Sequence, residues 1–198
     1  MIKMPTPNGV SGGSGFYYQN QSNLFLITAR HVLFGRDPNS TNLLSTNASL
    51  ISYPAPESSN DKFEFDVDLD KTRVAGNIRR HPTTDVAVIK IAAILSSENN
   101  VYRFASLPGV TRPSQASSGN YKGFTTNNIS PFLAANAGSD IVMIGFPRSL
   151  ASAPTPIQLI DAEKPLLRHG IISGRNTQLR LLIVDATSFQ GNSGGPVQ

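Results

Sequence analysis

The sequence contains no cysteine among its 198 residues. This absence excludes disulfide frameworks, thiolate zinc sites and cysteine nucleophiles, so packing alone must hold the folded chain together. Charged residues are also scarce, at 15% against a usual value of about 25%. A content this low argues against a disordered chain, a coiled coil or a charged solenoid. The hydrophobic content of 39% allows a packed interior, yet no apolar run approaches the roughly 18 residues of a membrane-spanning helix.

Basic residues are in small excess over acidic ones, which gives a net charge of only +4 at pH 7. No block of five like charges occurs, so this excess is typical of an ordinary solvated surface, and we expect neither a nucleic-acid nor a membrane partner. Residues 1–5 lack the apolar stretch of a signal peptide. The compartment stays undetermined: the absent cysteines and signal peptide favour the cytoplasm, and a missing precursor start is the alternative.

Short apolar runs with a period of two residues dominate the chain, and this pattern predicts β-strands. The alternation is cleanest at 62–69 (KFEFDVDL), where apolar and charged residues fall on opposite faces. Helix signals are few: we expect one short turn of helix after Ala29 and another around 91–97. Many short strands between turn-rich connectors indicate an all-β sandwich or barrel. The other predicted strands are 15–20 and 23–28, which read as a hairpin, and 85–91, 140–146, 166–172 and 178–184.

Residues 106–120 (SLPGVTRPSQASSGN) form the most linker-like stretch of the sequence. Proline, glycine and serine are the residues that interrupt regular structure most strongly. The stretch therefore divides the predicted strands into an N-terminal set and a C-terminal set.

The strongest chemical signal is the run Gly-Asn-Ser-Gly-Gly-Pro at 191–196. A serine among glycines is a candidate nucleophile, because small neighbours let the backbone turn sharply and leave N–H groups free to face a substrate oxygen. The N–H groups of Gly191 and Ser193 would form such an oxyanion hole. The alternative interpretation is an ordinary serine- and glycine-rich loop.

Two further signals complete a catalytic set. His31 directly follows an apolar strand, where a general base belongs, although a lone histidine is more often a plain surface or core residue. Asp85 opens an apolar strand and can orient an imidazole, although an aspartate before a strand is also a common turn residue. Together with Ser193 they occur in the order His, Asp, Ser, which is one of the known chain orders of the serine-hydrolase triad.

At three places the sequence resembles the trypsin-like serine peptidases of the chymotrypsin fold: TARHV (28–32), DVAVIKI (85–91) and GNSGGPV (191–197). Asn192 before the serine and the lack of cysteine look most like the bacterial and organellar high-temperature-requirement branch. The stretches GSGF (13–16) and GIIS (170–173) are similar to that branch as well.

The resemblance implies a double six-stranded β-barrel acting as one peptidase unit, with His31 and Asp85 in a first barrel (1–107) and Ser193 in a second (108–198). His31 would take the proton of Ser193 as it attacks a peptide carbonyl, while Asp85 holds the imidazole. The substrate would be a polypeptide, and no cofactor or metal is needed.

Two positions depart from the secreted members of this family. Asn192 stands where they have an aspartate that pairs with a newly cut N-terminus, so we expect no activation by N-terminal cleavage. Thr187 stands at the base of the primary specificity pocket instead of an aspartate. We therefore expect no preference for Lys or Arg and favour a small or medium apolar side chain. Thr187 and Asn192 are the predicted substrate-binding residues.

The family normally continues beyond the serine with further strands, whereas Gln198 ends this sequence. We therefore expect a second barrel that is incomplete at its C-terminal end, and a natural chain that extends past Gln198. A further C-terminal domain or a partner that completes the barrel is an alternative. An inactive or partner-completed binding module with the peptidase fold is the alternative to an active enzyme.

The remaining histidines and a group of aspartates suggest no metal centre. His81 and His169 are interpreted as surface or packed residues, because no carboxylate has a suitable spacing from them. Asp66 and Asp68 fall on the polar face of a strand, so a solvated face is preferred to a calcium site for them and for the neighbouring Asp61 and Asp70.

Overall fold

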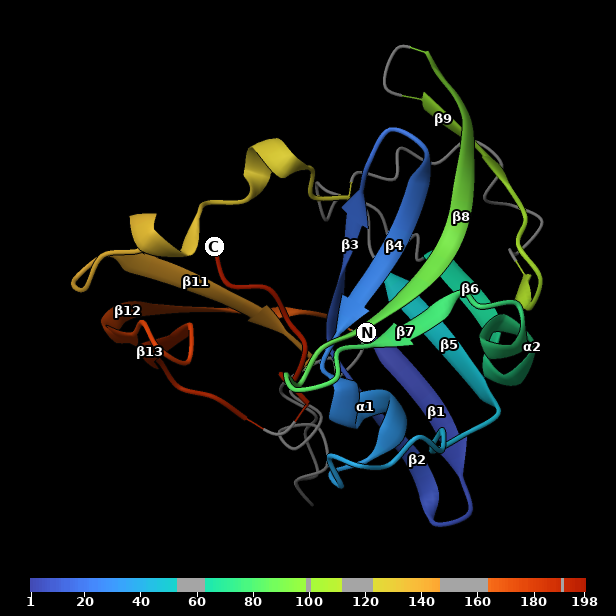
Figure 1. The fold of residues 1–198 in the computed structure, drawn as a ribbon, viewed down its shortest axis with the longest axis horizontal. Helices are drawn as coiled ribbons and strands as arrows, with labels where there is room; N and C mark the ends of the chain where they lie inside the picture. Colours follow the sequence, from blue (N-terminus) through green and yellow to red (C-terminus); the bar gives the residue numbers. More distant parts are fainter. Residues whose placement is uncertain (53–62, 99–100, 112–122, 147–163, 190) are drawn as a thin grey trace, which may run out of the picture.

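The computed structural model describes residues 1–52, 63–98, 101–111, 123–146, 164–189 and 191–198. Antiparallel strands dominate these residues and confirm the all-β class (Figure 1). No helix in these ranges is long and apolar enough to cross a membrane. The strands form two five-stranded sheets and one three-stranded sheet.

The first five-stranded sheet has the strand order β10-β6-β5-β1-β2. It includes the predicted alternating strand, with Phe65 and Val67 buried and Asp66 exposed on the other face. Burying a side chain such as Phe65 stabilises a fold by about 1.5–3 kcal/mol. The bounds are β1 (Ile2–Thr6), β2 (Gly9–Gly13), β5 (Asn47–Ser52), β6 (Phe63–Asp68) and β10 (Val110–Thr111).

The second five-stranded sheet has the order β3-β4-β8-β7, with β9 also paired to β8. The predicted hairpin is confirmed as β3 and β4, in which Gly15 faces Thr28. In turn, β4 pairs with β8 so that Thr28 faces Ala87. The bounds are β3 (Gly15–Gln19), β4 (Asn23–Thr28), β7 (Ile78–Arg80), β8 (Ala87–Glu98) and β9 (Val101–Ala105).

The main hydrophobic core lies between the two five-stranded sheets. Fully buried side chains come from both of them: Ile2, Met4, Leu50, Phe65 and Val67 from the first, and Leu24, Leu26, Ile89 and Ile91 from the second. The chain crosses from one sheet to the other at Ser14, the single residue between β2 and β3.

The structure differs from the sequence-based expectation at one predicted helix and at the end of one predicted strand. The helix expected around 91–97 is wrong, because this segment belongs to the long strand β8, which pairs with β4 and with β9. The strand predicted to run to Leu69 ends at Asp68, whose side chain accepts the Lys71 N–H and caps the helix α2 (Leu69–Val74). The short helix expected after Ala29 is confirmed as α1 (Arg30–Phe34).

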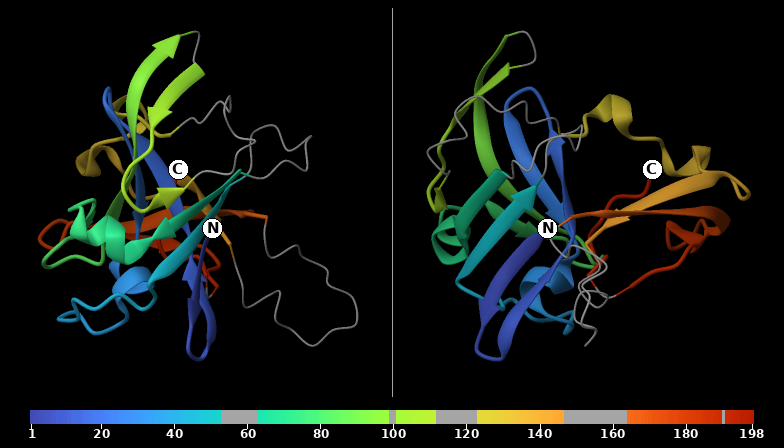
Figure 2. Two further views of the ribbon diagram at one scale, coloured as in Figure 1. Left: turned by 90° about the vertical axis from the view of Figure 1, so that its right-hand side faces the viewer. Right: turned by 180° about the vertical axis from the view of Figure 1, so that it is seen from behind.

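The third sheet, β11-β12-β13, lies to one side of the other two (Figures 1 and 2). The C-terminal segment joins it, since Val142 and Gln198 exchange two backbone hydrogen bonds and the Ile144 N–H donates to Pro196. The bounds are β11 (Asp140–Gly145), β12 (Leu166–Asn176) and β13 (Leu181–Asp185), and two short 3₁₀ turns (Thr126–Asn128 and Phe132–Ala134) precede them.

The predicted strands after residue 139 are all present, with β12 longer and β13 shorter than expected. Several large apolar side chains of this sheet are exposed, among them Leu167, Leu181 and Ile183. The two six-stranded barrels and the division at residue 107 stay predictions. Most of the linker-like stretch, 112–120, lies outside the described residues.

Candidate active site

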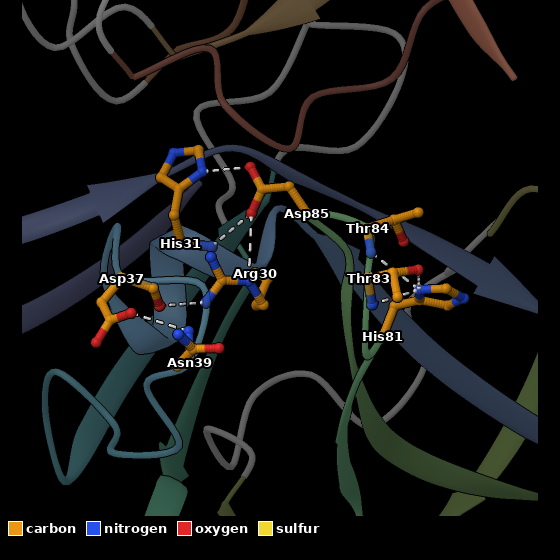
Figure 3. Close-up of polar contacts among 8 residues, drawn as sticks. All are labelled: Arg30, His31, Asp37, Asn39, His81, Thr83, Thr84 and Asp85. Atoms are coloured by element: carbon orange, nitrogen blue, oxygen red, sulfur yellow. Dashed lines mark hydrogen bonds and ion pairs between the residues drawn. The ribbon is translucent and has the colours of Figure 1, made fainter. Parts of the chain in front are cut away.

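His31 and Asp85 meet because of the pairing of β4 with β8. Thr28 at the end of β4 faces Ala87 at the start of β8, so the residues just beyond these ends are neighbours. Nδ1 of His31 lies 2.5 Å from Oδ2 of Asp85, and the His31 backbone N–H donates to Oδ1 at 2.8 Å (Figure 3). One carboxylate therefore fixes both the imidazole ring and the backbone that carries it.

Arg30 supports the same carboxylate from a buried position. Its side chain is 8% exposed, and its Nε lies 4.0 Å from Oδ1 of Asp85. Its Nη1 donates to the Asp37 carbonyl at 2.8 Å, which anchors the guanidinium (Figure 3). We assigned no role to this residue from the sequence. Its position directly before His31 was the one feature of the sequence that could have pointed to a role in this site.

The His31–Asp85 pair is accessible from solvent. The side chain of His31 is 31% exposed and that of Asp85 is 52% exposed. The hydrogen bond to Nδ1 leaves Nε2, the other ring nitrogen, as the atom available to a reacting group. The pair can therefore accept a proton from a molecule or side chain that approaches the exposed edge of the ring.

The loop around Ser193 packs against the junction of the two five-stranded sheets. The Ser14 backbone N–H donates to the Ser193 carbonyl at 2.9 Å. The Ser14 hydroxyl donates to the Gly191 carbonyl at 2.7 Å, and its own carbonyl accepts from Oγ1 of Thr28 at 2.7 Å. These bonds bring the serine loop to the end of β4, three residues before His31.

Glycines at 194 and 195 are required for this packing. A Cβ on Gly194 would lie 2.4 Å from the Ser14 carbonyl oxygen and 2.6 Å from the Ala29 nitrogen, and the residue has a positive φ of 87°. A Cβ on Gly195 would lie 2.1 Å from the Ile144 carbonyl oxygen of β11. The loop is therefore wedged between the second and third sheets, which explains why glycines flank the serine.

The backbone N–H groups of Gly191 and Ser193 point to no partner in the described part of the chain. The neighbouring N–H groups do bond within the loop, from Asn192 to the Phe189 carbonyl and from Gly195 to the Asn192 carbonyl. Two free donors on a turn held by its neighbours can bind an oxygen that carries negative charge. No hydrogen bond joins His31 to Ser193 in the structure as described.

Asn192 and Thr187 flank Phe189 in the sequence and make different contacts. The side chain of Asn192 packs on Gly145, where an added Cβ would lie 2.6 Å from Oδ1. This buried Oδ1 has no hydrogen-bond partner among the residues that the structure describes. Thr187 is exposed, and its carbonyl lies 3.5 Å from Nη1 of Arg168. The Arg168 guanidinium stacks on the Phe189 ring, 4.0 Å from its centroid.

Neither of the other two histidines forms a hydrogen bond with His31, Asp85 or Ser193 in the described part of the chain. Nδ1 of His81 accepts the Thr84 N–H at 3.0 Å and so stabilises the turn that directly precedes Asp85 (Figure 3). Nε2 of His169 lies 3.0 Å from Oδ1 of Asp140 on the surface of the third sheet.

The aspartates have local roles. Asp66 accepts the Ser49 hydroxyl, and Asp68 caps α2. Asp61 lies outside the described residues. Among the residues described, no three histidine or acidic side chains gather as metal ligands would.

Comparison with known families identifies most of the chain. Residues 13–198 match the family model of the trypsin-like peptidase domain. No curated protein sequence matches the chain significantly. The family match includes the His31–Asp85 pair, the serine loop and every described strand from β3 onward.

Proposed function

The chain belongs to the trypsin-like peptidase domain family, and from this premise we propose that it is a serine endopeptidase with His31, Asp85 and Ser193 as its triad. The observation that carries the proposal is the 2.5 Å contact between His31 and Asp85. The resemblance to the trypsin-like peptidases implies such a pair, and the two residues lie 54 positions apart in sequence. The proposal places the protein nearest to the high-temperature-requirement branch, on the motifs around Ser14 and Asn192.

The proposed reaction begins with the orientation of the imidazole. Nδ1–H of His31 donates to the Asp85 carboxylate, so Nε2 carries the lone pair that accepts the Ser193 hydroxyl proton. Ser193 Oγ then attacks the peptide carbonyl, and Asp85 stabilises the resulting imidazolium. His31 returns its proton to the leaving amine, and water hydrolyses the acyl-enzyme by the same route.

The negative oxygen of the tetrahedral intermediate would bind the N–H groups of Gly191 and Ser193. Both donors are unused by the described protein, which supports this role. A preorganised donor of this kind is worth about 10²–10³ in kcat.

The proposed substrate preference follows from the charges around Thr187, which precedes the serine loop. Thr187 brings no negative charge, and the Arg168 guanidinium lies beside its carbonyl. A cation at this place disfavours a second cation, so we propose that the enzyme does not cleave preferentially after Lys or Arg. Asn192 makes no ion pair with an N-terminal ammonium, which supports an enzyme that needs no activating cut.

The test is covalent labelling of the purified 198-residue chain with a fluorophosphonate, detected by intact mass and peptide mapping. We expect a single label on Ser193 and none on the Ser193→Ala variant. A folded chain that takes no label, or takes it elsewhere, contradicts the proposal. That result would favour the alternative of a binding module with the peptidase fold, for which no separate observation speaks.

A further inference from the structure

We propose that Ser14 is a positioning residue for catalysis. Its hydroxyl hydrogen bonds to both Gly191 and Phe146, and so holds in place the loop of residues 191–195 that carries the proposed oxyanion donors. The inference rests on the proposed function, because its consequence is measured at Ser193. It concerns only the hydroxyl, since the backbone of Ser14 makes separate contacts.

Ser14 lies where the three sheets meet. It is the single residue between β2 and β3, and it is 1% exposed. Its hydroxyl donates to the Gly191 carbonyl at 2.7 Å and accepts the Phe146 N–H at 2.9 Å. Phe146 directly follows β11, so one hydroxyl joins the crossing between the first two sheets, the end of the third sheet and the serine loop.

The hydroxyl bonds are separable from the backbone bonds of the same residue. The Ser14 N–H donates to the Ser193 carbonyl, and the Ser14 carbonyl accepts from Thr28. Any residue but proline has the backbone groups for these two contacts, whereas the contacts with Gly191 and Phe146 need the side-chain oxygen. Replacement of Ser14 by alanine therefore removes one defined part of the network.

The carbonyl that the hydroxyl holds belongs to the peptide between the two proposed oxyanion donors. Gly191 has a positive φ of 106° and no side chain, so its own conformational preferences restrain this peptide weakly. The bond from Ser14 supplies the restraint that the glycine lacks. Without it, a change in ψ of Gly191 or in φ of Asn192 would alter the angle between the Gly191 and Ser193 N–H groups, which must point to a common oxygen.

The second bond of the hydroxyl fixes the other side of the loop. The Phe146 N–H accepted by the hydroxyl directly follows Gly145. The Asn192 side chain packs closely on Gly145, because a Cβ added to Gly145 would lie 2.6 Å from Asn192 Oδ1. Loss of the hydroxyl leaves both a buried carbonyl and a buried N–H without a partner, and the chain can recover these bonds only by moving. The movable part is the glycine-rich loop, so the cost falls on the catalytic geometry.

The experiment compares the wild type with Ser14→Ala and with the control Thr72→Ala. Thr72 is 0% exposed and its hydroxyl donates to the Asp68 carbonyl at 2.7 Å in α2, so it is a buried hydroxyl outside the site. We expect Ser14→Ala to slow fluorophosphonate labelling of Ser193 by about 10–100-fold, the range for small displacements of catalytic groups. On a peptide substrate we expect kcat to fall and KM to change little. Thr72→Ala should lose stability in urea without slower labelling.

Ser14→Cys provides a variant that keeps the packing if the alanine variant fails to fold. A thiol fills nearly the same space but forms only weak hydrogen bonds, so labelling should again be slower than in the wild type. Wild-type labelling rates in folded Ser14→Ala or Ser14→Cys would overturn the inference. A wild-type protein that takes no label at Ser193 would instead contradict the proposed function, so the two failures are distinguishable.

Discussion

Asp85 holds His31 at two points: its Oδ2 lies 2.5 Å from Nδ1 of the imidazole, and its Oδ1 accepts the His31 backbone N–H at 2.8 Å. The ring cannot turn away without breaking the first bond, and the first turn of α1 cannot move without breaking the second. The carboxylate thus sets both the tautomer and the position of the proposed general base.

Replacement of Asp85 by asparagine should lower kcat by about 10⁴-fold, because an amide that donates to Nδ1 favours the wrong imidazole tautomer. Peptide hydrolysis and fluorophosphonate labelling both measure this loss. The matched control is Asp140→Asn, since Asp140 and His169 form a second His–Asp pair on the surface, 3.0 Å apart. Equal activity of the Asp85→Asn variant and the wild type would rule out the assigned role.

Replacement of Arg30 by glutamine should lower the free energy of unfolding by about 1.5–3 kcal/mol, the range for a hydrogen bond of a charged group. The change removes the bond to the Asp37 carbonyl and the cation beside Asp85. Urea denaturation measures the effect, and Arg36→Gln, at an exposed position, is the control. Equal stability of the two variants would show that Arg30 contributes no more than a surface cation.

Replacement of Gly194 by alanine should abolish labelling of Ser193, because the new Cβ would lie 2.4 Å from the Ser14 carbonyl oxygen. Gly138→Ala is the control, since Gly138 has nearly the same positive φ of 86° and nothing within 4 Å of an added Cβ. The control should lose about 1–2 kcal/mol of stability from backbone strain alone and keep its labelling rate. Full labelling of Gly194→Ala would mean that the loop does not pack on β3 and β4 as described.

Cleavage preference should exclude Lys and Arg on the acyl side of the cut bond. The Thr187 carbonyl lies 3.5 Å from the Arg168 guanidinium, and no carboxylate pairs with Arg168 among the described residues. Sequencing the new ends produced from a mixture of unfolded proteins gives the preference directly. A majority of cuts after Lys or Arg would contradict the assignment of this segment to the specificity site.

The chain order His, Asp, Ser and the resemblance to the trypsin-like peptidases led us to expect that His31 and Asp85 act together, and the pairing of β4 with β8 supplies the physical reason. Each residue adjoins a strongly apolar strand, and strand ends that pair in an antiparallel sheet bring such residues together. The buried face of β6 was predicted from the alternation of apolar and charged residues, which places Phe65 and Val67 on one side of the strand. The segment 91–97 misled the prediction because a short apolar run fits a buried strand as well as a helix.

The network around Ser14 was beyond sequence reasoning. Its hydroxyl bonds reach residues 177 and 132 positions away, and nothing in the local pattern GSGF indicates which buried carbonyl or N–H a serine will meet. The cap at Asp68, by contrast, had a local signal, since an aspartate before a short helical turn is a common N-cap. Long-range polar contacts thus depend on the assembled sheets, whereas caps and faces depend on neighbouring residues.

The most direct test of the central claim is peptide hydrolysis by the wild type and by Ser193→Ala, measured side by side on the same unfolded protein substrate. We predict a loss on the order of a million-fold in kcat for the variant, because the nucleophile is removed while the His31–Asp85 pair remains. Hydrolysis by Ser193→Ala at the rate of the wild type would contradict the proposed mechanism.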